Sequence, residues 1–175
     1  MDKNTLLIDA FMAYNKTFPT ELFPDTPEGK IFHEYYDGNF RHLGWMDIVL
    51  LKHIVKKHNY SHIILQNLNT LGKIATITKS VQVCVAYKYK SHYILPSIRK
   101  DTNLKKCKPL YKTIVFGGWN SSDDDFEIHV RAKHYMKYIL VQTQVETVTY
   151  QTNKVKVIAH FDSNKNVVFD YETLS

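Results

Sequence analysis

The stretch Phe40–Val55, FRHLGWMDIVLLKHIV, predicts an amphipathic helix around which the rest of the chain is organised. Its apolar residues recur at spacings of three and four, which is the helical period: Trp45, Ile48, Leu51, Ile54 and Val55. We expect Gly44 and Trp45 to open this helix. Asp47 then falls in the first turn, where a carboxylate suits the positive end of the helix dipole. By itself the pattern predicts a helix with one face packed in the core and the opposite face exposed to solvent.

The length and composition are those of one ordinary globular domain, residues 1–175. Cys84 and Cys107 are far apart and show no metal-binding spacing, which favours a reducing, cytoplasmic location. Cys84, in the apolar run VCVAY, is expected to be a buried thiol, and Cys107 is left undecided. The N-terminus does not resemble a signal peptide, and no apolar run is long enough to span a bilayer.

The net charge of +6 comes mostly from lysine, because only three of the 23 basic residues are arginine. Proteins that read nucleic acids depend on arginine for bidentate contacts, so nucleic acid is not an expected partner. The densest basic segment, Arg99–Lys108, is interpreted as a solvated loop, with a phosphate-binding surface as the alternative. Abundant Lys, Asn, Ile and Tyr suggest an AT-rich genome, such as that of a virus or parasite.

Several short segments have strand-like patterns, and they flank two predicted helices. The predicted strands are Leu6–Phe11, Ser61–Leu65, Val81–Tyr89, Tyr93–Leu95, Leu110–Val115, Val145–Tyr150, Val155–Phe161 and Val167–Phe169. The second helix is expected over Phe126–Val141, with the preceding Asp123–Asp125 as its cap rather than a metal site. Pro24, Pro27 and Gly29 predict irregular structure. This order of elements indicates an α/β fold, a partial sheet with flanking helices.

A set of motifs in a defined order resembles one known family. The motifs are FPTEL from Phe18, LGW-D from Leu43, VCVAYKY from Val83, P-x-Y from Pro109 with Gly118-Trp119 after it, and A-x-x-Y-x-x-x-I from Ala132. They are similar to the C-terminal portion of adenylosuccinate synthetase, which joins IMP to aspartate with GTP. The resemblance implies the C-terminal part of that fold, over about residues 6–161.

The resemblance also implies that the chain lacks catalytic residues. In that family the phosphate-binding loop and the catalytic Asp and His belong to the N-terminal half, for which this chain has no counterpart. A glycine-rich phosphate loop presents backbone N–H groups at a helix start, and no such motif occurs here. We therefore assign no catalytic, metal-binding or cofactor-binding residue, and we expect no cofactor and no enzymatic activity.

Three ligand-binding segments of the family align with altered residues. The guanine-reading T-K-L-D segment aligns with Gln66–Asn69. Asn69 stands in place of a carboxylate that accepts from two N–H donors of guanine, so its amide donor would face a guanine donor, at a cost of roughly 1–3 kcal/mol in binding. Asn67 stands in place of a lysine and lacks the long stem that the lysine lays along the base. The aspartate loop aligns with Tyr35–His42, in which Gly38 and Arg41 remain. Asn39 and Phe40 replace two arginines, and Asp37 adds a negative charge, which would repel the dicarboxylate ligand of this loop. The S-x-G-P-D-R turn aligns with Tyr150–Lys154, without its Gly and Pro.

These changes favour a non-catalytic interaction protein, a pseudoenzyme on a truncated synthetase fold. Since the family's sheet continues into strands without counterpart here, we expect an open strand edge that binds another chain. That chain would be a second copy, giving an oligomer, or a host protein in the host cytoplasm if the source is a virus.

Two alternatives stay open. The first is a remnant that still binds a purine or nucleotide, with Gly38, Asn67 and Asn69 as remnant positions and Arg41, Lys52 or Lys73 as anion contacts. The second is an enzyme of another chemistry, suggested by nine histidines. Those on the predicted helices, His53 with His58 and His129 with His134, are spaced i, i+5, which is not the i, i+4 spacing of a zinc helix.

Overall fold

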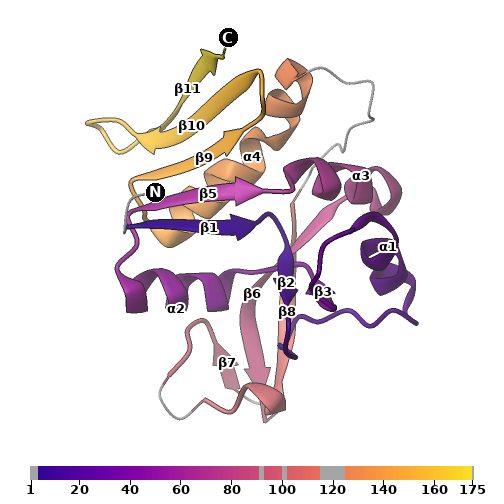
Figure 1. The fold of residues 1–175 in the computed structure, drawn as a ribbon. Helices are drawn as coiled ribbons and strands as arrows, with labels where there is room; N and C mark the ends of the chain where they lie inside the picture. Colours follow the sequence, from indigo (N-terminus) through magenta and orange to yellow (C-terminus); the bar gives the residue numbers. More distant parts are fainter. Residues whose placement is uncertain (1–3, 91–92, 100–101, 115–124, 175) are drawn as a thin grey trace.

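The computed structural model describes residues 4–90, 93–99, 102–114 and 125–174, with only the backbone for 125–130. A five-stranded sheet forms its larger half, in the order β1-β5-β9-β10-β11 (Figure 1). The first three strands are parallel and the last two pairings are antiparallel. Their bounds are β1 Thr5–Asp9, β5 His62–Gln66, β9 Thr147–Gln151, β10 Val155–Phe161 and β11 Val167–Thr173.

A second sheet is built on the long strand β6, Val81–Tyr89, which pairs with β4, β7 and β8. These are Met46–Asp47, Tyr93–Leu95 and Cys107–Ile114, with a short 3₁₀ turn, η1, at Leu104–Lys106. A two-stranded ribbon of β2, Met12–Tyr14, and β3, His42–Gly44, lies between the sheets. The mixed α/β fold predicted from the sequence is confirmed.

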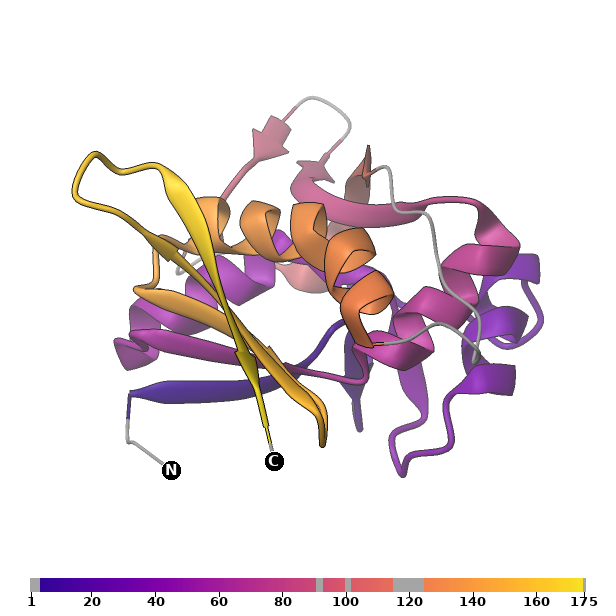
Figure 2. The same ribbon diagram turned by 90° about the horizontal axis from the view of Figure 1, so that it is seen from above.

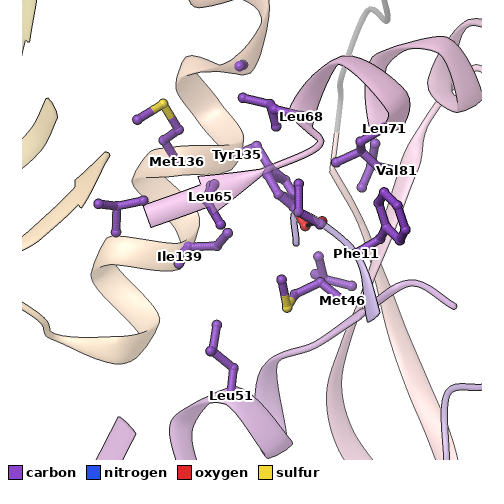
Figure 3. Packing of buried hydrophobic residues seen from close by; sticks show 14 of the residues in the cluster. Phe11, Met46, Leu51, Leu65, Leu68, Leu71, Val81, Tyr135, Met136 and Ile139 are labelled. Atoms are coloured by element: carbon purple, nitrogen blue, oxygen red, sulfur yellow. Dashed lines mark hydrogen bonds between the residues drawn. The ribbon is translucent and has the colours of Figure 1, made fainter. Parts of the chain in front are cut away.

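Two helices, α2 (Ile48–His58) and α4 (Asp125–Thr143), pack on the same face of the five-stranded sheet (Figure 2). Helix α2 contributes Ile48, Leu51 and Val55 to the core, and α4 contributes Tyr135, Met136 and Ile139. These side chains meet Leu65 of β5 and Phe11, which follows β1 (Figure 3). Two further helices, α1 (Pro27–Tyr35) and α3 (Leu68–Thr78), lie toward the carboxyl ends of β1 and β5.

The motifs FPTEL and LGW-D are in direct contact. The Thr20 hydroxyl donates to the Trp45 carbonyl over 3.3 Å, and the Leu22 N–H donates to the Leu43 carbonyl over 2.8 Å. Gly44 lies so close to this segment that an added Cβ would be 2.1 Å from the Thr20 carbonyl oxygen. The two motifs therefore form one structural unit, which explains why a glycine precedes the tryptophan.

The predicted start of the first helix was wrong. Residues 42–47 form β3 and β4, and the helix begins at Ile48, with Asp47 as its N-cap. The Asp47 carboxylate accepts from the Leu50 N–H over 3.1 Å. Trp45 shares the helical spacing, but it packs in the core from a strand connection, because tertiary contacts with FPTEL hold this segment extended.

The irregular structure predicted around Pro24, Pro27 and Gly29 is found only up to Thr26, and the prediction was wrong from Pro27, where α1 begins. Thr26 is the N-cap, and its hydroxyl accepts from the Gly29 N–H over 3.1 Å. Proline is favoured in the first turn of a helix, where its missing N–H has no intrahelical partner to lose. The same residue type therefore marks a helix start here rather than a break.

Helix α3 was not predicted, although Leu68, Leu71, Ile74 and Ala75 are buried at helical spacing. The predicted strands and second helix coincide with observed elements, with shifted ends in several cases, whereas β2 was not predicted separately from β1. Cys84 is buried as expected, and Cys107 is buried too. The predicted Asp123–Asp125 cap and the Gly118-Trp119 motif lie outside the residues whose side chains are described.

Candidate functional site

The remnant ligand positions lie at the carboxyl ends of β1 and β5, which adjoin in the sheet. Ligand sites of parallel α/β sheets occur at this end of the strands. Asn67 directly follows β5 and precedes α3, while Gly38 and Arg41 lie on the loop between α1 and β3. The contacts of Asn67 and of the loop with Gly38 and Arg41 therefore bear on whether a ligand could bind there.

Asn67 is held in place by a residue that the sequence analysis did not single out. Its amide Nδ2 donates to Asp9 Oδ1 over 2.5 Å, which joins the ends of the two strands. Asn67 has a left-handed backbone, with φ of 57°, a conformation that asparagine tolerates better than most residues. The side chain at this position therefore contacts a carboxylate of the same chain.

The loop that carries Gly38 and Arg41 is anchored at the same place. The Tyr36 ring packs edge-on against Phe11, which lies two residues beyond Asp9, with ring centroids 5.6 Å apart. An added Cβ on Gly38 would be 2.1 Å from the Tyr36 hydroxyl oxygen, so glycine lets this ring lie against the loop. The structure thus brings the loop and the ends of β1 and β5 into one region.

This region contains two carboxyl groups, those of Asp9 and Asp37, which both act on Tyr36. Burial raises the pKa of Asp9, and the hydrogen bond from Asn67 partly opposes that rise. The pKa of Tyr36 is raised first by burial and then by the charges of Asp9 and Asp37, opposed in part by a hydrogen bond with the Phe40 backbone. Two carboxylates near one point oppose the binding of a phosphate or a dicarboxylate. Arg41 is exposed on the same loop.

The other candidate anion contacts are on helices α3 and α2. Lys73 is an exposed residue of α3. Lys52 lines a hollow of about 510 Å³ between α2 and the carboxyl end of α4. Of residues 150–154, the first two end β9 and 152–154 form the tight connection to β10, where the Thr152 N–H donates to the Val155 carbonyl over 2.8 Å. The candidate anion contacts Arg41, Lys52 and Lys73 therefore lie on three different elements, the loop before β3, α2 and α3.

A second cluster of polar groups is buried between α2 and β6. Tyr87 donates its hydroxyl proton to Asp47 Oδ2 over 2.5 Å. Burial raises the pKa of Asp47 to about 6, although hydrogen bonds from Tyr87 and the α2 backbone oppose the rise. Burial, with the nearby Asp47 charge, raises the pKa of the Cys84 thiol, so it is an unreactive thiol. This cluster holds the start of α2 against β6, which is a structural role.

Metal-ligand groups and membrane-spanning helices were both sought in the described part of the chain, and neither is found there. No three His, Cys, Asp or Glu side chains are grouped there so that they could hold a metal ion. None of the described helices combines the length and apolar character needed to cross a membrane.

The fold and the motif order together define a partial synthetase-type α/β protein. The family model described as adenylosuccinate synthetase matches residues 15–158, and the chain belongs to this family. The adenylosuccinate synthetase of Finegoldia magna is 30% identical over 157 residues, and that of Thermoanaerobacter sp. is 35% identical over 106 residues.

The chain spans about a quarter to a third of the length of these relatives. The matches cover 86% of this chain and 34% of the Finegoldia protein, and 58% and 24% in the Thermoanaerobacter comparison. The solved structure of fully ligated adenylosuccinate synthetase from Plasmodium falciparum superposes with a TM-score of 0.60 at 20% identity, over 81% of this chain and 36% of that chain. This likeness supports the fold.

Proposed function

We propose that this chain is a non-catalytic protein-binding module built on part of the adenylosuccinate synthetase fold. The observation that carries the proposal is an uncovered face of the five-stranded sheet. Helices α2 and α4 cover one face, and no described element lies over the other (Figures 1 and 2). Parallel strands normally have both faces covered, so this face is suited to a partner.

The uncovered face has an apolar centre and a polar rim. Strand register aligns Leu7, Ile64, Thr149 and Ile158 in one row across four strands. The neighbouring row contains His62, which contacts the Thr147 hydroxyl over 2.8 Å, and His160, which contacts the Asp170 carboxylate over 2.9 Å. An apolar centre within a polar rim is the usual anatomy of a protein interface. The partner is a second copy of the chain or a host protein in the cytoplasm.

The proposal predicts that a charge at the centre of this face weakens binding. In Ile158→Lys, the ammonium would have to be desolvated beneath the partner, so we expect at least a tenfold loss of affinity. Immobilised chain and its variants are compared for self-association and for stoichiometric capture of a protein from host lysate. Ile77→Lys is the matched control, because Ile77 is an exposed isoleucine of α3. Equal binding by all three proteins would contradict the proposal.

We also predict that the chain alone neither binds GTP or IMP nor forms adenylosuccinate. The reasons are the two carboxylates near the remnant site and the engagement of Asn67 by Asp9. Calorimetry with each nucleotide, and product analysis after incubation with IMP, aspartate, GTP and Mg²⁺, test this prediction. Saturable binding that Arg41→Ala weakens would favour a nucleotide-binding remnant instead, and product formation would show an enzyme.

A further inference from the structure

A pocket of about 310 Å³ lies between the FPTEL segment and the turn η1 that precedes β8. The first of these segments contributes Thr17, Phe18, Pro19, Glu21 and Phe23 to its lining, and the second contributes Leu104, Lys105 and Cys107. One water molecule takes up about 30 Å³ in the liquid, so the pocket has room for a side chain. These residues belong neither to the remnant ligand positions nor to the uncovered face of the five-stranded sheet.

The Glu21 carboxylate in the wall of this pocket is buried with one of its two oxygens engaged. Its side chain is 7% exposed, and Oε2 lies 2.7 Å from Nδ1 of His42. The other oxygen, Oε1, is also buried, and it has no hydrogen-bond partner within the described part of the chain. Buried polar atoms of native proteins are nearly always paired, and an exception commonly marks a bound group. Glu21 can therefore accept from one further donor.

Two phenylalanine side chains line the pocket together with this carboxylate. The Glu21 N–H donates to the Phe18 carbonyl over 3.2 Å, so a tight turn brings these two residues together. Phe18 packs edge-on against Tyr14, with ring centroids 5.2 Å apart, and Phe23 is 55% exposed. Aromatic rings attract cations over their faces, and a carboxylate adds an opposite charge. The pocket is therefore suited to a cation.

We propose that the pocket formed by Glu21, Phe18 and Phe23 binds the arginine side chain of a protein partner. A guanidinium suits it better than an ammonium, because it is planar, stacks on aromatic rings and is more weakly hydrated. One of its N–H groups would donate to Glu21 Oε1 in a charge-assisted hydrogen bond. Lys105 is exposed at the same pocket, so its charge opposes the ligand and lowers the affinity. The proposal goes beyond the proposed function, because it adds a contact at a different place with its own chemistry.

An NMR titration of the isotope-labelled chain with the blocked tripeptide acetyl-Gly-Arg-Gly-amide tests the site. We expect a dissociation constant of about 1 mM, which is typical of one well-placed side chain, and shifts of the Glu21 and Phe23 amide signals. The same peptide with citrulline has nearly the shape of the arginine peptide without its charge, and it should bind at least tenfold more weakly. Equal binding of the two peptides, or no binding of either, would overturn the proposal.

Variants of the pocket separate the charge of Glu21 from its structural role. Glu21→Gln keeps the size of the side chain and an oxygen for His42, and it should weaken binding of the arginine peptide at least tenfold. Phe23→Ala changes an exposed residue, so it should remain folded and bind the peptide several-fold more weakly. Glu172→Gln on β11 is the matched control, because Glu172 is exposed. Circular dichroism checks the fold of each variant, and unchanged binding by Phe23→Ala and Glu21→Gln would reject the site.

A variant of Lys105 tests whether this lysine is itself the partner of the Glu21 carboxylate. If the pocket binds arginine, Lys105→Gln should bind the arginine peptide several-fold more tightly and keep its midpoint of urea unfolding. If Lys105 pairs with Glu21 instead, the variant should unfold at a lower urea concentration and gain no affinity for the peptide. The second result would contradict the arginine site. It would leave the protein-binding face of the five-stranded sheet untouched, because Ile158→Lys tests that face separately.

Discussion

Replacing Trp45 with alanine should lower the free energy of unfolding by about 3–5 kcal/mol, as is typical of large buried aromatic residues. Trp45 is 1% exposed, and its ring packs edge-on against Phe32 with centroids 4.8 Å apart. Its Nε1–H donates to Glu28 Oε2 over 3.0 Å, which ties the connection between β3 and β4 to α1. The substitution would remove this hydrogen bond and leave a cavity beside Phe32 of α1. A domain of this size has a stability of about 5–15 kcal/mol, so the variant would be close to unfolding.

Urea unfolding followed by circular dichroism measures this effect. Trp45→Phe keeps an aromatic ring and removes the indole N–H, so we expect a smaller loss of about 1–2 kcal/mol. Phe23→Ala is the matched control, because Phe23 is 55% exposed, and it should change stability by less than about 1 kcal/mol. A loss below about 1 kcal/mol for Trp45→Ala would show that the packing of Trp45 against α1 is not what stabilises this part of the fold.

Replacing Asp47 with alanine should cost about 2–4 kcal/mol, because two interactions are lost together. The first is the N-cap of α2, usually worth about 0.5–2 kcal/mol. The second is the acceptor of the Tyr87 hydroxyl, which would leave a buried polar group unpaired at a cost of about 1–3 kcal/mol. Asparagine keeps a cap oxygen and a hydrogen-bonding partner for Tyr87, so Asp47→Asn should be milder.

The pH dependence of stability separates the charge of Asp47 from its hydrogen bonds. Its pKa is raised to about 6 in the folded protein and is near 4 when the chain is unfolded. The folded state therefore holds the proton more tightly. The resulting stabilisation is complete below about pH 4 and is lost as the pH rises through about 6. The expected loss across this window is about 1–3 kcal/mol.

Urea titrations at several pH values between 4 and 7 measure this loss by comparing the wild type with Asp47→Asn. The variant should lack the Asp47 contribution, so the difference between the two stability curves should grow by that amount as the pH rises. Asp25→Asn is the control, because Asp25 is exposed. A constant difference between wild type and Asp47→Asn would mean that the carboxylate titrates normally in the folded protein.

Elements with a strong local pattern could be predicted from the sequence. Val81–Tyr89 consists largely of β-branched and aromatic residues, and its predicted bounds are those of β6. Helix α4 has apolar residues at helical spacing over many turns, so its pattern is unambiguous. Helix α1 was missed because Pro27 and Gly29 favour turns on average, and only the Thr26 cap shows that they start a helix.

The candidate site was predictable only in part. The sequence indicated Gly38, Arg41, Asn67 and Asn69 by alignment of motifs, and the structure places the two segments in one region. Asp9 was missed, although a carboxylate at the end of a predicted parallel strand is a signal that could have drawn attention to it. That its partner is Asn67, 58 residues away, depends on strand pairing that a linear pattern does not contain.

The sequence by itself determined the α/β class, the family motifs and most of the strands, because these follow from local periodicity and from residue types at short spacing. Tertiary structure decided that Trp45 lies outside α2, since contacts with FPTEL hold residues 42–47 extended against their helical spacing. It also decided which sheet face is covered and which strand lies at the edge. Both depend on how distant segments pack, and burial is a property of that packing rather than of any single stretch.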